Sequence, residues 1–125
     1  MEKIAVIGAG SWGTALAQTL AAGGNEVCMW ARREEVAQSI THAHRNPRYL
    51  SGIVLEEAIC ATSNLEECVA DAKAVVMVTP SRLTRSFAQQ LSAFLCSDTP
   101  IILCSKGVEE GTGMVPMQVF EEVLG

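Results

Sequence analysis

Three glycines near the N-terminus have the spacing of a phosphate-binding turn. The segment 8–13 reads Gly-Ala-Gly-Ser-Trp-Gly and follows a short apolar run at 3–7. We expect Gly8 to allow the tight turn, Gly10 to let the backbone approach a pyrophosphate, and Gly13 to let the next helix pack closely. The position of the segment, after a strand and before a helix, is typical of a dinucleotide site.

The helix that begins after this turn should supply hydrogen-bond donors for phosphates. Free N–H groups near Ser11 and Trp12 would face the ligand, with the positive end of the helix dipole behind them. A glycine-rich turn without a ligand is the alternative. A phosphate-transferring P-loop is excluded, because Gly13 is followed by Thr14 and Ala15 instead of Lys and Ser or Thr.

The residues that follow the second apolar run bear on which dinucleotide is bound. An NAD-specific domain usually has an acidic residue there, about 20 residues past the glycines, to hold the ribose 2′-hydroxyl. This chain has Arg32 and Arg33 instead. Two guanidinium groups suit a 2′-phosphate, so we favour NADP over NAD. Glu34 and Glu35 are the alternative partners of a hydroxyl, although the dipole of the next helix also explains acidic residues there.

Apolar runs of strand length alternate with stretches of helical periodicity, which is the pattern of βαβ units. We therefore expect an α/β fold, a Rossmann-type doubly wound parallel sheet in three layers, with strand order 3-2-1-4-5. Residues 1–125 would form one dinucleotide-binding domain. The expected strands are 3–7, 26–30, 58–62, 74–79 and 100–104, and the expected helices are 12–22, 82–95, 116–124 and a short one at 34–43.

Two helices allow more specific predictions. Ser63 and Glu66 have the spacing of a capping box, which predicts that a short helix begins after Ser63. In the helix at 12–22, one face gathers the residues that we expect to point inward: Trp12, Ala15, Leu16, Thr19 and Leu20.

Composition and charge exclude several classes of protein. The net charge of −5 is unsuited to a nucleic-acid partner, which requires a basic face. No apolar stretch reaches the roughly 20 residues of a membrane span, and the N-terminus enters a strand directly, without room for a signal peptide. The five cysteines contain no C-x-x-C pair, so we expect inert buried thiols in a cytoplasmic protein.

Other polar residues leave alternatives open. His42 and His44 lie two positions apart without a third ligand nearby, so we expect no metal site. Arg45 and Arg48 either extend the positive rim of the cofactor site or are exposed loop charges. The segment 78–81, Val-Thr-Pro-Ser, either lines the site at the end of a strand or caps the next helix.

Five segments together carry a more specific signal: Gly-Ser-Trp-Gly-Thr-Ala-Leu-Ala at 10–17, Trp-Ala-Arg-Arg at 30–33, Asn-Pro-Arg-Tyr-Leu-Ser-Gly at 46–52, Val-Thr-Pro-Ser at 78–81 and Ser-Lys-Gly at 105–107. In this order they closely resemble the bacterial glycerol-3-phosphate dehydrogenases, and the resemblance covers essentially the whole chain. Ser51 stands where the family usually has proline, a difference in loop stiffness that should not alter the chemistry.

The resemblance implies an enzyme that uses NADP or NAD to interconvert dihydroxyacetone phosphate and sn-glycerol 3-phosphate for glycerophospholipid synthesis. It also implies that Lys106 contacts both cofactor and substrate, and the place of this lysine, just beyond the carboxyl end of a strand, suits such a role. A solvated loop lysine is the alternative. The other cofactor contacts implied by the resemblance are Ser11, Trp12, Arg32, Arg33 and Tyr49.

Members of this family are much longer than 125 residues. Their helical C-terminal domain supplies the catalytic lysine and most phosphate-binding residues, so we expect no catalytic residue in this chain, weak cofactor binding and no turnover. The complete enzyme is expected to be a homo-oligomer. Two other functions stay open: the cofactor domain of a related oxo-acid reductase, such as a ketopantoate reductase, and a stand-alone nucleotide-sensing module.

Overall fold

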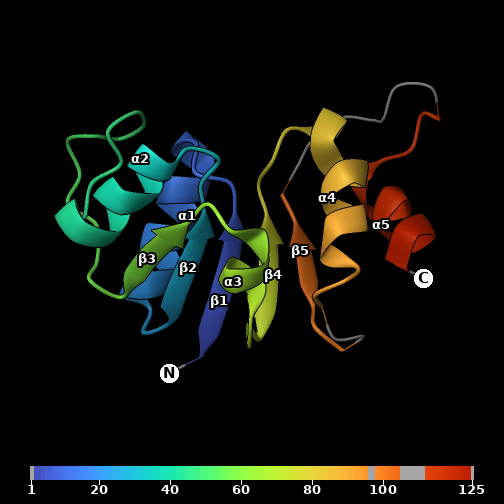
Figure 1. Ribbon diagram of the computed structural model, residues 1–125, viewed down its shortest axis with the longest axis horizontal. Coiled ribbons are helices and arrows are strands. Elements are labelled where there is room, and N and C mark those ends of the chain that lie inside the picture. The colour runs from blue at the N-terminus through green and yellow to red at the C-terminus, as the bar shows by residue number, and fades with distance from the viewer. Residues whose placement is uncertain (1, 96–97, 105–111, 125) are drawn as a thin grey trace.

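The computed structural model describes residues 2–95, 98–104 and 112–124, and it shows five parallel strands flanked by helices on both faces (Figure 1). The order β3-β2-β1-β4-β5 confirms the predicted topology and the Rossmann-type fold class. The strands are β1 (Lys3–Ile7), β2 (Glu26–Trp30), β3 (Ile59–Thr62), β4 (Ala74–Met77) and β5 (Ile101–Leu103). The helices are α1 (Ser11–Ala22), α2 (Glu34–Gln38), α3 (Leu65–Val69), α4 (Thr84–Leu91) and α5 (Pro116–Leu124), and a 3₁₀ turn, Ser81–Leu83, precedes α4.

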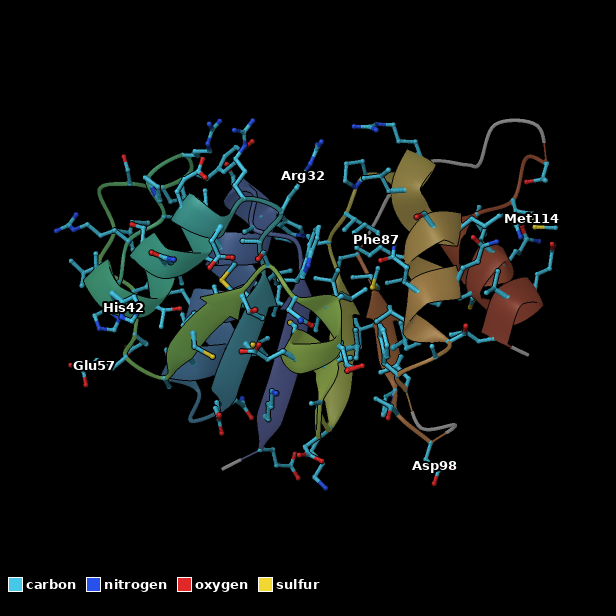
Figure 2. The ribbon with its side chains drawn as sticks, viewed as in Figure 1. Arg32, His42, Glu57, Phe87, Asp98 and Met114 are labelled. Carbon is cyan, nitrogen blue, oxygen red and sulfur yellow. The ribbon has the colours of Figure 1, made fainter. Side chains whose placement is uncertain are left out.

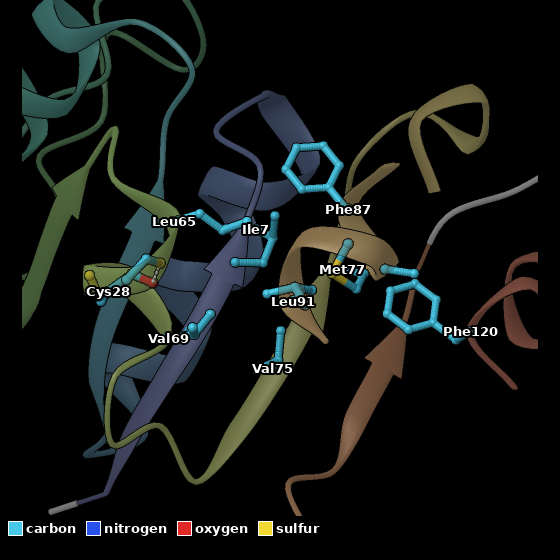
Figure 3. Packing of buried hydrophobic residues seen from close by; sticks show 12 residues of the cluster. Ile7, Cys28, Leu65, Val69, Val75, Met77, Phe87, Leu91 and Phe120 are labelled. Carbon is cyan, nitrogen blue, oxygen red and sulfur yellow. Dashed lines mark hydrogen bonds between the residues drawn. The ribbon is translucent and has the colours of Figure 1, made fainter. Parts of the chain in front are cut away.

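Two apolar layers, one on each face of the sheet, hold the strands between the helices. Alternation along β1 places Ala5 and Ile7 on one face and Val6 on the other, all fully buried. The face of Ile7 is covered by α3, α4 and α5, from which Leu91 and Phe120 reach inward (Figure 3). The face of Val6 is covered by α1 and α2. Burial on both faces explains why the strands are almost continuously apolar.

All strands run in the same direction, so their carboxyl ends meet at one edge of the sheet, the upper edge in Figure 1. This edge receives the glycine turn after β1, the arginines after β2 and the segment 78–80 after β4. Ligands of open α/β sheets bind at this edge, where the strand order reverses. The topology therefore gathers the predicted site residues from separate parts of the chain.

The predicted inward face of the first helix is wrong for Trp12 and Thr19, whereas Leu16 and Leu20 pack against the core as expected. Trp12 is 61% exposed and Thr19 is also exposed. The reason is the close approach of α1 to the turn before it, which leaves room only for small side chains between helix and sheet, while the larger Leu16 and Leu20 pack at the flank. The residues of α1 that are buried are Gly13, Thr14, Ala17 and Ala21.

The predicted capping box is also wrong. The short helix α3 begins at Leu65, and its N-cap is Asn64, whose side chain accepts a hydrogen bond of 3.0 Å from the backbone N–H of Glu67. The hydroxyl of Ser63 instead donates to the carboxylate of Glu34, at the start of α2. The helix therefore starts one residue later than a Ser63 cap would place it.

Two predicted helices change character along their length. The stretch predicted at 34–43 is α-helical only in α2 and continues as a π-helical turn over Ser39–Ala43. In this turn the hydroxyl of Thr41 donates to the carbonyl of Ala61 in β3 and accepts from its N–H, at 3.1 and 2.9 Å. The helix predicted at 82–95 is a 3₁₀ turn followed by the shorter α4. No helix among the described residues is long and apolar enough to cross a membrane.

Three thiols lie close together between the sheet and α3, two from strands and one from the helix. Cys28 and Cys60 face each other in the register of β2 and β3, and the Sγ of Cys68 donates to the carbonyl of Cys28 over 3.3 Å. The Cys60 thiol lowers the pKa of Cys28, but the Cys68 thiol and burial outweigh it and raise that pKa to about 12. Contact with Cys28, followed by burial, raises the pKa of Cys60 as well. Cys104 is partly buried, and Cys96 lies outside the described residues.

We predict that Gly13→Ala destabilises the fold, because a Cβ atom there would lie 2.4 Å from the carbonyl oxygen of Gly8. The loss should be about 1–3 kcal/mol or more, visible as a lower urea midpoint. Gly10→Ala is the matched control, since nothing lies within 4 Å of its Cβ position. Equal stability of the two variants would contradict the close packing described here.

We predict that iodoacetamide at about pH 8 leaves Cys28 and Cys60 unmodified in the folded chain and labels both in urea, because only the thiolate reacts. The pKa of Cys28 rises on folding from 9.0 to about 12. Stability from this group is therefore fully present below pH 9.0 and is lost as the pH rises toward 12. Mass spectrometry would measure the labelling, and urea unfolding across this pH range would measure the stability. Rapid labelling of the folded chain would contradict the first expectation, and a stability that does not fall above pH 9.0 would contradict the second.

Candidate nucleotide-binding site

The glycine turn is anchored between the two strands that flank β1. Gly8 has a φ of +129°, which glycine adopts readily, and its N–H donates to the carbonyl of Trp30 over 3.2 Å. On the other side, a Cβ atom on Gly8 would lie 3.0 Å from the carbonyl oxygen of Val78. The turn thus lies where the chain order of the strands reverses, between the ends of β2 and β4.

Helix α1 begins without a side-chain cap. Its N-cap is Gly10, and the first hydrogen bond of the helix runs from the N–H of Thr14 to the Gly10 carbonyl, at 2.9 Å. The N–H groups of Ser11, Trp12 and Gly13 come before this bond. No acidic residue lies in the first turn. An uncapped helix start of this kind offers backbone donors and a partial positive charge to an anion.

A cleft of about 1030 Å³ opens over the glycine turn. Its wall is built from the turn itself, the end of β2, the 46–52 loop, the end of β4 and the start of α4. In Figure 2 the Arg32 side chain extends beyond the strand ends, and Phe87 belongs to α4; both residues line the cleft. The volume suits a ligand of cofactor size.

The structure brings most of the predicted site residues to this cleft. Ser11 and Gly13 belong to the start of α1 without lining the cleft, and Lys106 lies outside the described residues. The predicted residues that line it are Gly8, Gly10, Trp12, Arg32, Arg33 and Tyr49.

Basic side chains dominate the end of β2. Arg32 and Arg33 line the cleft, whereas Glu34 and Glu35 do not. The Ser63 hydroxyl, and after it Gln38, hydrogen-bond to the Glu34 carboxylate and lower its pKa. Glu35 lies 3.8 Å from Arg33 in an exposed ion pair, which is a weak interaction. The groups available to a ribose substituent in the cleft are therefore guanidinium groups.

An apolar wall, which the sequence did not reveal, lies beside these arginines. The rings of Trp30 and Phe87 meet edge to face, with centroids 5.1 Å apart, and the indole N–H of Trp30 donates to the Ser63 carbonyl over 3.0 Å. Both residues line the cleft, as does Leu83. Such a wall is suited to the flat ring of a base. The only sign of this wall in the sequence was the position of Trp30 at the end of the second apolar run, next to the arginines.

The loop at 46–52 contributes a further arginine. Arg48 lines the cleft, together with Arg82 from the segment after β4. Arg45 does not line it; its Nη1 donates to the carbonyl of Ser51 over 3.0 Å and so braces the loop. Arg48 is thus available to a ligand in the cleft, whereas Arg45 is bonded within the loop. Thr79 also lines the cleft and is buried.

The two histidines lie apart from the cleft. His42 is exposed on the π-helical turn, and His44 is half-buried in a left-handed conformation, with a φ of 56°. Within the described ranges, no group of three or more His, Cys, Asp or Glu side chains could hold a metal ion.

Comparison with known families identifies the domain. The sequence profile of the family described as NAD-dependent glycerol-3-phosphate dehydrogenase N-terminus matches residues 3–125. The chain belongs to this family. The resemblance seen in the sequence is thereby confirmed, and the fold is that of the family's N-terminal NAD-binding domain.

The similar proteins include members of this family and a reductase of another family that shares the fold. The glycerol-3-phosphate dehydrogenase [NAD(P)+] of Parvibaculum lavamentivorans is 46% identical over 121 residues, which cover 97% of this chain and 36% of the relative. The crystal structure of glycerol-3-phosphate dehydrogenase from Coxiella burnetii has a TM-score of 0.92 at 28% identity, covering 99% of this chain and 38% of that one. A ketopantoate reductase from Ralstonia eutropha has a TM-score of 0.74 at 25% identity, over 98% and 38%. The chain thus spans little more than a third of the length of these relatives.

Proposed function

We propose that residues 1–125 form one NAD(P)H-binding domain that holds the dinucleotide in the cleft over the glycine turn. The observation that carries the proposal is the uncapped start of α1, which opens next to a cleft lined by Arg32 and Arg33. The pyrophosphate would lie against the N–H groups of Ser11 and Trp12. The open space at Gly10 leaves room for this approach.

The remaining lining residues fit the other parts of a dinucleotide. Arg32 and Arg33 would hold the 2′-phosphate of NADPH, and this favours NADP over NAD as cofactor. Trp12 and Tyr49, both exposed at the mouth, would flank the bound cofactor. Lys106 is proposed to contact cofactor and substrate on the strength of the family resemblance. The bound dinucleotide would supply a hydride; the residues of this chain bind and orient it.

In a protein with the length of its relatives, this domain would serve the reversible reduction of dihydroxyacetone phosphate to sn-glycerol 3-phosphate. Its relatives are named glycerol-3-phosphate dehydrogenase [NAD(P)+], which supports this substrate pair. The product would be the backbone of glycerophospholipids, made in the cytoplasm. No residue of this chain is assigned to proton transfer, so we propose that the chain alone binds cofactor weakly and does not turn over.

The partners proposed are the small substrates and a second copy of the protein. The net charge of −5 disfavours nucleic acid. A shallow apolar hollow between β5 and the start of α5 is lined by Ile101 and Leu103, and the nearby Met117 is 60% exposed. Exposed apolar surface of this kind supports association into a homo-oligomer.

We predict that the 125-residue chain binds NADPH more tightly than NADH, and that Arg32→Ala weakens NADPH binding roughly tenfold or more while NADH changes little. The reason is the loss of a charge-assisted bond to the 2′-phosphate. Quenching of Trp12 and Trp30 fluorescence would measure both affinities. Lys73→Ala is the control, because it removes one positive charge from an exposed position before β4, at the opposite edge of the sheet from the cleft. Equal loss of both cofactors on Arg32→Ala would contradict a 2′-phosphate contact.

We predict that a protein of full family length carrying this domain oxidises NADPH in the presence of dihydroxyacetone phosphate, and not with ketopantoate. Absorbance at the nicotinamide band would follow the reaction, and the 125-residue chain alone would serve as the inactive control. Activity with ketopantoate instead would assign the domain to an oxo-acid reductase. Tight cofactor binding by the short chain, without activity in the long protein, would favour a nucleotide-sensing module.

A further inference from the structure

Asn46 is a buried polar residue in a loop that is otherwise largely exposed. Its side chain has no accessible surface, whereas the adjacent Arg45 and Pro47 are exposed. Among the described residues, the chain from 44 to 58 forms turns and bends without helix or strand. A backbone bond of 2.7 Å from the N–H of Leu55 to the carbonyl of His44 closes the base of the loop, and side-chain contacts must position the rest. A fully buried amide is an expensive group to place there unless all its polar atoms are bonded.

One side of the Asn46 amide bonds the glycine turn. Its Nδ2 donates to the carbonyl of Ala9 over 2.8 Å and to the Oγ1 of Thr14 over 2.9 Å. Ala9 lies between the first two glycines and lines the cleft, and Thr14 is fully buried where α1 makes its first hydrogen bond. Both amide hydrogens are thus bonded to the glycine turn and the first turn of α1, which would hold the pyrophosphate.

The other side of the amide bonds the loop. The Oδ1 of Asn46 accepts from the N–H groups of Arg48 and Tyr49, at 3.0 and 3.2 Å. The first of these bonds forms an Asx turn, a motif in which the side chain fixes the backbone two residues on. Arg48 and Tyr49 are the two residues of this loop whose side chains line the cleft.

We propose that Asn46 is a positioning residue that joins the Arg48–Tyr49 wall of the cleft to the glycine turn. It fixes the position of this wall before the dinucleotide binds and so increases the affinity of the cleft for the dinucleotide. The inference rests on the proposed cofactor function and adds to it a residue that does not line the cleft. A single amide with donors toward one element and acceptors toward the other fixes their separation. Pre-ordering of the loop reduces the conformational entropy that ligand binding would otherwise have to remove.

Substitutions separate the two halves of this link. Asn46→Ala removes both. Asn46→Asp keeps the acceptors for Arg48 and Tyr49 but places a carboxylate, which cannot donate, against the carbonyl of Ala9. Thr14→Val removes one acceptor on the glycine side and keeps the side-chain shape, so it tests the link even if a change at Asn46 prevents folding. Asn25→Ala is the matched control, because it loses an amide bond of 3.0 Å to Leu20 at the far end of α1.

The experiment combines NADPH titration, hydrogen exchange of the 47–55 segment and urea unfolding of the 125-residue chain. In Asn46→Ala we expect the amides of Arg48 and Tyr49 to exchange at least tenfold faster and NADPH to bind roughly tenfold more weakly. In Asn46→Asp these amides should stay protected while NADPH affinity still falls, a combination that general destabilisation would not produce. Thr14→Val should lower the affinity less, and Asn25→Ala should change neither quantity.

Unchanged exchange in Asn46→Ala, or NADPH binding within about twofold of the unsubstituted chain, would overturn the inference. Asn25→Ala weakening NADPH binding as much as Asn46→Ala would also overturn it, because loss of stability would then suffice. If the unsubstituted chain binds neither NADPH nor NADH, the proposal that this chain binds the dinucleotide by itself fails instead. Faster exchange in Asn46→Ala, or in Thr14→Val, would then still support Asn46 as the link between the loop and the turn.

Discussion

The contact between the start of α1 and the turn before it is the constraint on which the rest of the structure depends. The backbone of Gly13 lies so close to the carbonyl of Gly8 that no side chain fits between them. This contact sets how near the helix comes to the sheet, and the small Ala17 and Ala21 continue the close packing along its length. It also places the first N–H groups of the helix at the edge where β2 and β4 end, so one packing contact serves both the core and the candidate anion site.

The topology could be predicted from the sequence because it depends on local patterns: short apolar runs, helical periodicity and glycines between them. The residues of α1 that face the sheet could not be predicted in the same way. Periodicity selects hydrophobic side chains, but here the close contact between the Gly13 and Gly8 backbones decides which side chains fit. Trp12 is apolar yet too large for that interface. The N-cap of α3 was misplaced for a different reason. Ser63 and Asn64 are both good caps, and the choice between them is made by Glu34, which lies far away in the sequence and engages the Ser63 hydroxyl.

The residues of the candidate site also fall into two groups, those that local sequence patterns could predict and those that they could not. Its glycines and arginines belong to one continuous βαβ unit, so their spacing carried the prediction. The ring pair of Trp30 and Phe87 joins β2 to α4, and Asn46 joins a loop to a turn that lies 37 positions earlier. Pairs of this kind leave no period or spacing in a single sequence, because each partner is ordinary in its own segment. Only the three-dimensional arrangement shows that the ring pair forms one wall of the cleft and that Asn46, outside the lining, bonds the 46–52 loop to the glycine turn.

The bonds between Thr41 and Ala61 have a consequence for how the sheet can grow. β3 is an edge strand, and the N–H and carbonyl of Ala61 point away from β2, where an added strand would bond them. The Thr41 hydroxyl occupies both groups. An exposed strand edge invites pairing with other chains and aggregation, and covering it is a common protection. The outward-facing groups of β3 at Ala61 are thus already bonded, which disfavours the pairing of a further strand along β3.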